Sequence, residues 1–196
     1  MNNIDAALAI QPFSMYFSLD NGMSDTKKTT KRFLSQMKGM YYDAKAYDEM
    51  LEQGDSLIYE FYEMDIPATE GDLAFGTSIT YPGKVGNEYF MTKGHFHKII
   101  DTAEVYYCIG GKGIMLMEDS EGRWDSQEMT PGKVVYAPKG FAHRTINTGN
   151  EPLITFFVFR ADAGHDYATI ETLGYRKLIL EKEGSPIIAN NPNWNK

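Results

Sequence analysis

The sequence predicts an all-β domain, an antiparallel sandwich or barrel with short helices at both ends. Segments rich in Tyr, Phe, Ile and Val recur between about residues 56 and 160, and turn residues such as Pro82-Gly83, Gly110-Gly111 and Pro131-Gly132 separate them. Their spacing is even and no helical period lies between them, which favours antiparallel over parallel strands. A chain of 196 residues suits a single domain with one well-developed core.

An N-terminal extension over about residues 1–55 precedes the barrel core of about residues 56–160. Asp43 can cap a helix that Gly54 ends, and apolar residues of this segment share one face, namely Ala44, Tyr47, Met50 and Leu51. The core strands are expected at Ser56–Glu63, Leu73–Tyr81, Glu88–Thr92, Glu104–Ile109, Gly113–Glu118, Lys133–Ala137, Thr145–Asn147 and Leu153–Phe159.

The C-terminal part, about residues 161–196, is expected to hold one short helix and one strand. Asp166 can cap a helix that runs through Leu173, and Gly174 would end it. The last strand is expected at Tyr175–Leu180.

Composition excludes several classes of protein. The net charge is -8, so nucleic acid is not an expected partner, and we interpret the basic cluster Lys27-Lys28 with Lys31-Arg32 as a solvated face. One cysteine cannot form an intrachain disulfide, which makes the cytoplasm the default location. The longest strongly apolar run, Leu153–Phe159, is far shorter than the ~20 residues of a membrane helix. The N-terminus has no basic stretch of the kind that begins an export signal.

Three of the four histidines fall in two short segments. His95 and His97 are two residues apart, so on a strand they point from one face with Cα atoms ~6.5–7 Å apart, while Phe96 points the other way. A hairpin over residues 98–103 would place the Glu104 carboxylate beside the two rings. His143 follows the turn Pro138-Lys139-Gly140 and can enter from a third strand.

A set of three histidines and one glutamate suits Fe(II), Mn(II), Ni(II) or Zn(II), and would leave two positions of an octahedral ion open. A lone histidine on a strand is usually a hydrogen-bonded structural residue. The pair two residues apart, the glutamate that follows and the distant third histidine reverse that expectation. The sequence therefore predicts a metal site.

The second histidine segment resembles a cupin motif. Its fixed positions Gly132, Pro138, Gly140, His143 and Asn147 all match the second cupin motif. The first cupin motif matches less well, because six residues separate His97 from Glu104 and because Tyr89 stands where glycine is usual.

These departures are shared by the cupin-type (archaeal) glucose-6-phosphate isomerases, which the chain resembles from about residue 25 to the C-terminus. The run from Tyr81 to His97 is similar to the signature of that family. Further similar segments are Ala142–Thr145, Ala161–Tyr167 and Asn191–Trp194.

The resemblance implies a cupin barrel, which is a double-stranded β-helix or jelly roll, in a homodimer that interconverts glucose 6-phosphate and fructose 6-phosphate in glycolysis and gluconeogenesis. It implies one divalent metal ion per subunit, most often iron. The implied metal ligands are His95, His97, Glu104 and His143. The implied phosphate and sugar contacts are Tyr59, Ser78, Thr92, Gly94 and Tyr167, with Tyr106 and His165 nearby as catalytic candidates. Ser78 stands where threonine is expected, and Phe159 where tyrosine is common.

The residue types suit an aldose–ketose isomerisation. Hydroxyls and backbone N–H groups around Thr92-Lys93-Gly94 can receive a phosphate dianion, and Lys93 can add charge. Glu104 is the only acidic residue in the predicted constellation, so it is the candidate base for a cis-enediol route, although a bound cation weakens it as a base. A direct hydride shift assisted by the metal is the alternative route. Tyr106 shares the face of Glu104 and can contact substrate or pack.

Two other functions use the same ligands. A metal cupin such as a dioxygenase would require a drier, more apolar pocket than these Tyr, Ser and Thr residues suggest. A non-enzymatic sugar-sensing cupin would normally carry a DNA-binding domain, for which the chain has no room.

Overall fold

Antiparallel pairing dominates the structure, a computed structural model that describes residues 11–24 and 29–194. Part of the predicted N-terminal extension, including Lys27 and Lys28, lies outside the described residues. The largest sheet contains, in spatial order, β1 (Thr29–Phe33), β2 (Leu57–Glu63), β3 (Leu73–Thr80), β12 (Leu153–Arg160), β7 (Glu104–Gly110) and β10 (Val134–Ala137).

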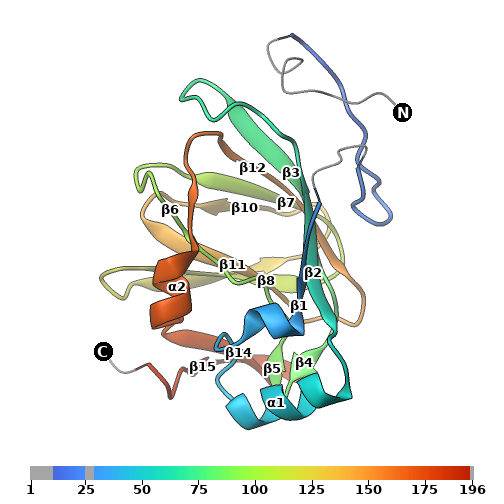
Figure 1. Ribbon diagram of the computed structural model, residues 1–196, viewed down its shortest axis with the longest axis vertical. Helices are drawn as coiled ribbons and strands as arrows, with labels where there is room; N and C mark the ends of the chain where they lie inside the picture. The colour runs from blue at the N-terminus through green and yellow to red at the C-terminus, as the bar shows by residue number, and fades with distance from the viewer. Residues whose placement is uncertain (1–10, 25–28, 195–196) are drawn as a thin grey trace.

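A second sheet packs against the first, as the layers in Figure 1 show. It contains β11 (Phe141–Asn147), β8 (Gly113–Asp119) and β9 (Trp124–Met129) in that order. Burial alternates along β7, where Glu104, Tyr106 and Cys108 are buried while Val105 and Tyr107 are exposed. The buried side chains of the two sheets fall into two apolar clusters. β7, β8 and β12 contribute to one, and β2, β8 and β11 contribute to the other. The prediction of an all-β cupin barrel is confirmed.

Two small sheets complete the barrel. One pairs β6 (Phe96–His97) with β13 (His165–Asp166), and the other contains β15 (Ser185–Asn190), β14 (Lys177–Lys182), β5 (Glu88–Tyr89) and β4 (Lys84–Val85). Isolated bridges join Met91 to Ile146 and His95 to His143. The segment that carries the first two histidines is therefore attached to β11.

The short helices lie at the edge of the barrel (Figure 1). A 3-10 turn, η2 (Leu34–Met37), precedes α1 (Ala44–Gln53), and α2 (Tyr167–Leu173) follows β13. The predicted caps are confirmed: the Asp43 carboxylate accepts from the backbone N–H of Ala46, and that of Asp166 from the N–H of Thr169. No helix among the described residues is long and apolar enough to cross a membrane.

Six strands were not among those expected: the two-residue strands β4, β6 and β13, and the longer strands β1, β9 and β15. The expected strand Glu88–Thr92 is also shorter than expected. β1, β9 and β15 carry mostly exposed side chains, so they lack the alternation of apolar and polar residues that marks a half-buried strand. Ladder pairing of Glu88–Thr92 is confined to Glu88–Tyr89, after which the chain turns toward the histidines with a single bridge at Met91.

Glu88 is a buried carboxylate beneath the barrel. It is 1% exposed, and one of its oxygens accepts from the backbone N–H of Tyr42 at 2.9 Å while the other has no hydrogen-bond partner. Burial raises the pKa of this carboxyl to about 7, against smaller lowering effects of the Tyr42 N–H and the Arg144 charge.

This shift predicts how stability depends on pH. The folded protein holds the Glu88 proton up to about pH 7, whereas the unfolded chain releases it near 4.5, so ionisation between these values favours unfolding. We expect the wild type to lose up to about 3 kcal/mol of unfolding free energy relative to Glu88→Gln between pH 5 and pH 8. Thermal unfolding across this range measures the difference. The control, Glu52→Gln at an exposed position of α1, should track the wild type, and a Glu88→Gln curve parallel to the wild type would contradict the assignment.

Candidate functional site

Four segments bring three histidines and one glutamate to one point inside the barrel. His97 comes from β6, Glu104 from the first position of β7 and His143 from β11. His95 is held against β11 by two backbone hydrogen bonds with His143, of 3.3 and 3.2 Å. All four side chains are buried, and one ligand atom of each lies within 4.8 Å of the others. The predicted metal residues therefore converge.

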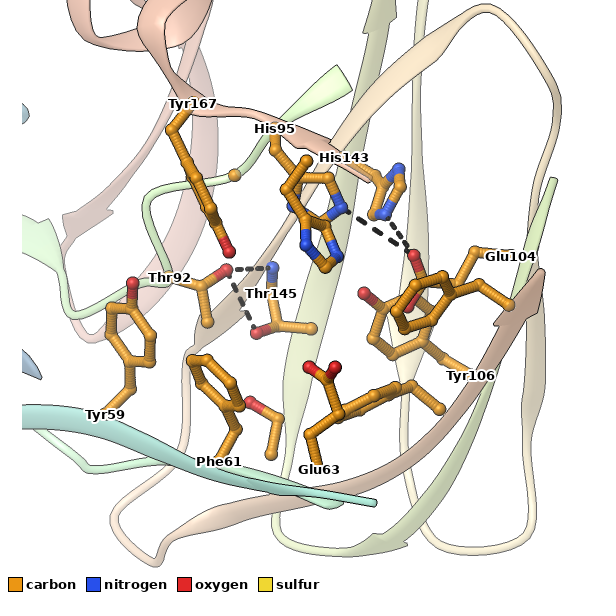
Figure 2. Close-up of a pocket in the computed structure, with 15 residues that line it drawn as sticks. Tyr59, Phe61, Glu63, Thr92, His95, Glu104, Tyr106, His143, Thr145 and Tyr167 are labelled. Atoms are coloured by element: carbon orange, nitrogen blue, oxygen red, sulfur yellow. Dashed lines mark hydrogen bonds and ion pairs between the residues drawn. The ribbon is translucent and has the colours of Figure 1, made fainter. Parts of the chain in front are cut away.

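One oxygen of the Glu104 carboxylate is the common partner of the rings, and Figure 2 shows its interactions with His95 and His143 as dashed lines. This Oε2 atom is 3.0 Å from Nε2 of His97, 2.9 Å from Nε2 of His143 and 3.8 Å from Nε2 of His95. The buried Nε2 of His95 has no hydrogen-bond partner. One acceptor oxygen thus faces three ring nitrogens.

The opposite ring nitrogens fix the tautomers. Nδ1 of His143 lies 3.3 Å from the backbone oxygen of Phe141, which can only accept, so Nδ1 carries the proton. Nδ1 of His97 lies 2.7 Å from the Thr102 hydroxyl, which itself donates to the carbonyl of Ile99 and therefore accepts from the ring. Both Nε2 atoms then present lone pairs to a carboxylate oxygen. Lone pairs facing one another require positive charge between them, either a proton on each ring nitrogen or one shared metal ion, and a divalent metal fits this donor set.

Burial sets the charge states in the cluster. Desolvation lowers the pKa of His95 to about 3, which keeps its ring neutral. Burial alone would raise the pKa of Glu104, but the positive charge and hydrogen bonds that the imidazoles supply when protonated, those of His143 foremost, outweigh burial and hold that pKa well below the usual range. A metal ion at the same point would act in the same direction. Neutral imidazoles and an ionised carboxylate are the forms that bind a divalent metal.

A pocket opens onto this cluster. The five predicted phosphate and sugar contacts, the two further catalytic candidates and three of the four predicted ligands line it: Tyr59, Ser78, Thr92, Gly94, Tyr167, Tyr106, His165, His95, Glu104 and His143. His97 is not in the lining. It lies behind the pocket, with its ring centroid 5.9 Å from that of Phe159.

The two catalytic candidates flank the cluster in fixed protonation states. Burial, and then the negative charge of Glu104, raise the pKa of Tyr106 well above its usual value, so its hydroxyl keeps its proton. The His165 ring stands 4.3 Å from the His95 ring and 5.1 Å from Phe159, and burial lowers its pKa to about 4. Tyr106 is thus a hydrogen-bond donor, and His165 is neutral.

The segment Thr92-Lys93-Gly94 forms one end of the pocket. The Thr92 hydroxyl accepts from the backbone N–H of Thr145 at 3.1 Å, as Figure 2 shows. Gly94 has φ +75°, and a Cβ there would collide with the Tyr175 hydroxyl and the His143 carbonyl, so this approach requires glycine. The Lys93 ammonium lies 2.5 Å from a Glu171 oxygen, so the charge expected from Lys93 is already paired.

Four lining residues were not predicted from the sequence, namely Phe61, Glu63, Thr145 and Phe157. Glu63 corrects the expectation that Glu104 is the only acidic residue of the site, and Figure 2 shows its carboxylate on the wall opposite the imidazoles. The alternation of β2 was a usable signal: once Tyr59 is placed on the pocket face, Phe61 and Glu63 follow on that face.

Comparisons with known proteins find relatives over most of the chain. The family model described as glucose-6-phosphate isomerase matches residues 30–195. The glucose-6-phosphate isomerase of Thermococcus litoralis is 47% identical over 184 residues, which cover 94% of this chain and 97% of the relative. That of Pyrococcus furiosus is 45% identical over 188 residues, or 95% and 98% of the two chains.

Among solved structures, Bacillus subtilis oxalate decarboxylase matches 53% of this chain and 26% of its own chain, with 26% identity and a TM-score of 0.44. The family match spans most of the chain, and the isomerase relatives are matched over nearly their full length. The chain therefore belongs to the glucose-6-phosphate isomerase family.

Proposed function

We propose that the chain interconverts glucose 6-phosphate and fructose 6-phosphate, with a divalent metal bound at His95, His97, Glu104 and His143. One observation carries the proposal: a cluster whose lone pairs require a cation opens into a pocket lined by hydroxyl groups. The isomerase relatives, 47% identical over 94% of this chain in one case, support the choice of substrate.

The two ends of the pocket differ, and this difference orients the substrate: one end is rich in hydroxyl groups, and the other holds the metal cluster. Thr92, Gly94 and the hydroxyls of Tyr59, Ser78 and Tyr167 supply neutral donors for the phosphate. The reacting carbons C1 and C2 then lie toward Glu104. The hydroxyl-rich end selects phosphorylated sugars, and the buried end excludes bulk water from the reaction.

The residues around C1 and C2 suit hydrogen transfer. When bound, a divalent metal would polarise the substrate oxygens as a Lewis acid. Glu104 is ionised and can accept the C2 proton, Tyr106 can donate a hydrogen bond to a substrate oxygen, and neutral His165 can accept a proton during ring opening. Direct hydride transfer between C2 and C1 is the competing route, in which Glu104 moves no proton.

The proposed cofactor is one ion per chain. A mixed nitrogen and oxygen donor set suits Fe(II), Mn(II), Ni(II) and Zn(II) alike, and the family resemblance puts Fe(II) first. The cytoplasm is the proposed location, as the single cysteine suggests.

We also propose a homodimer formed through the outer face of β7 and β10. The segment of residues 11–24 places Phe13 and Phe17 against the neighbouring strands β3 and β12 of this face. Beyond it, four apolar side chains from paired positions are 37–63% exposed, namely Val105, Tyr107, Val134 and Tyr136. A second copy would cover this patch.

Chelation of the metal should abolish isomerisation, and Fe(II), Mn(II) or Ni(II) should restore it. Fructose 6-phosphate conversion, oxygen uptake and bound metal are measured on the same sample. We expect His97→Ala and His143→Ala to lose far more metal than His165→Ala, because only the first two belong to the cluster. Full turnover by metal-free protein would refute the metal requirement, and oxygen uptake without isomerisation would indicate an oxygenase.

Glu104→Gln distinguishes the two routes of hydrogen transfer. If Glu104 is the base, the variant should keep much of its metal yet lose on the order of 10²-fold or more in kcat. Glucose 6-phosphate formed by the wild type in D₂O should then carry deuterium at C2.

Glu63→Gln is the matched comparison, because it removes the other carboxylate of the pocket and leaves the cluster intact. Loss of deuterium uptake in Glu63→Gln with retention in Glu104→Gln would assign the base to Glu63. Near-normal turnover of metal-loaded Glu104→Gln without solvent deuterium would favour hydride transfer.

The dimer is tested on the edge strand β10. Light scattering should give twice the 22.2 kDa chain mass for the wild type and a single chain mass for the double variant Val134→Lys/Tyr136→Lys, because two charges cannot be buried at such an interface. Ile188→Lys, at an exposed apolar position of β15, should remain dimeric. A monomeric wild type would contradict the proposal.

A further inference from the structure

The pocket has carboxylates but no cationic side chain in its lining. Among the described residues that line it, two are glutamates, Glu63 and Glu104, and none is lysine or arginine. A divalent metal beside Glu104 leaves one net positive charge, which is less than a phosphate dianion requires. The dianion would therefore enter without full compensation, unless a cation reaches it from the rim.

Two of the cations near Thr92-Lys93-Gly94 are committed elsewhere. The Lys93 ammonium is paired with Glu171. The Arg144 guanidinium donates to the Lys93 carbonyl at 2.8 Å and stacks on the Tyr175 ring at 3.9 Å, and Arg144 is not in the pocket lining. Neither presents its charge to the cavity.

Arg32, whose guanidinium donates to the Lys31 carbonyl at 3.4 Å, has the orientation that Lys93 and Arg144 lack. It pairs with Tyr59 in the antiparallel register of β1 and β2, and directly opposed residues project from the same face of a sheet. Tyr59 is 4% exposed and lines the pocket. Arg32 is half-buried, whereas its neighbour Lys31 is exposed and forms an ion pair with Glu60 at 3.5 Å. The pleat thus directs Arg32 to the pocket face and Lys31 away from it.

The ionisation of two tyrosines is sensitive to the Arg32 guanidinium. Burial raises the pKa of Tyr59, while the charge of Arg32, the backbone N–H of Lys93, a hydrogen bond from Arg32 and, last, the charge of Arg144 lower it. Burial likewise raises the pKa of Tyr167, and the Arg32 charge lowers it. In Figure 2 the hydroxyls of Tyr59 and Tyr167 both point toward the side of the pocket where Thr92 lies.

We propose that Arg32 binds the phosphate group of the substrate at this end of the pocket and thereby sets the preference for phosphorylated sugars. The inference rests on the proposed function and adds a charged residue to the neutral donors described above. A guanidinium suits the task because its planar N–H groups can bind two phosphate oxygens at once.

Arg32→Gln should raise KM for fructose 6-phosphate roughly ten- to a hundredfold, the usual value of a charge-assisted contact, with kcat changed by less than ~3-fold. The inhibition constant of inorganic phosphate should rise by a similar factor. Lys31→Gln is the matched control, because it removes a cation one residue away on the other face, and it should keep wild-type values. Tyr167→Phe removes one of the proposed neutral phosphate contacts and serves as the positive control. It should raise KM for fructose 6-phosphate by less than Arg32→Gln does.

Each outcome has one interpretation. Wild-type KM and phosphate inhibition in Arg32→Gln would overturn the inference. A raised KM with unchanged phosphate inhibition would also overturn it, because Arg32 would then act only by positioning Tyr59. Arg32→Met, which keeps the aliphatic stem, replaces the Gln variant if circular dichroism shows that the latter is unfolded. If the wild type does not isomerise fructose 6-phosphate, the proposed function fails, and calorimetric binding of inorganic phosphate to the same variants still tests Arg32.

Discussion

The convergence of unprotonated ring nitrogens on one carboxylate oxygen is the constraint on which the site depends. Such a cluster is unfavourable without a cation, so the fold must hold it in place by other contacts. The contacts are visible: Thr102 and the Phe141 carbonyl fix two rings, and the bridge between His95 and His143 fixes the third. Side chains from four segments are therefore positioned by the barrel, and a metal would relieve the repulsion that remains.

The apolar wall of the pocket also shapes the chemistry. Phe159 lines this wall, and its ring centroid lies 5.1 Å from that of His165. This contact leaves His165 in apolar surroundings, where burial lowers the pKa of the ring to about 4. The same wall includes Phe61 and Phe157. The resulting environment favours a neutral imidazole, which can accept a proton but has none of its own to lose at neutral pH.

Local patterns in the sequence predicted the elements that carry buried residues. The alternation in β7 correctly placed Glu104 and Tyr106 on one face, and Asp43 and Asp166 correctly marked two helix starts. The residues of the metal cluster were predicted because their spacing is itself informative. Glu63 was missed because a glutamate on a strand reads as exposed, and β9 was missed because its polar side chains give no periodic signal. The position of Glu63 in the pocket and the pairing of β9 in its sheet both depend on tertiary contacts, which the local sequence does not show.

The two adjacent basic residues of β1 show most clearly that the sequence alone does not tell which side of a strand faces the pocket. Lys31 and Arg32 form one basic cluster in the sequence, and a net charge of -8 makes a solvated face the natural interpretation of it. In a pleated strand the two residues face opposite sides, and only the structure shows that one side is the buried carboxylate Glu60 and the other the pocket-lining Tyr59. A strongly acidic protein that binds a dianion must concentrate positive charge locally, so the position of a cation in the fold matters more than the total charge.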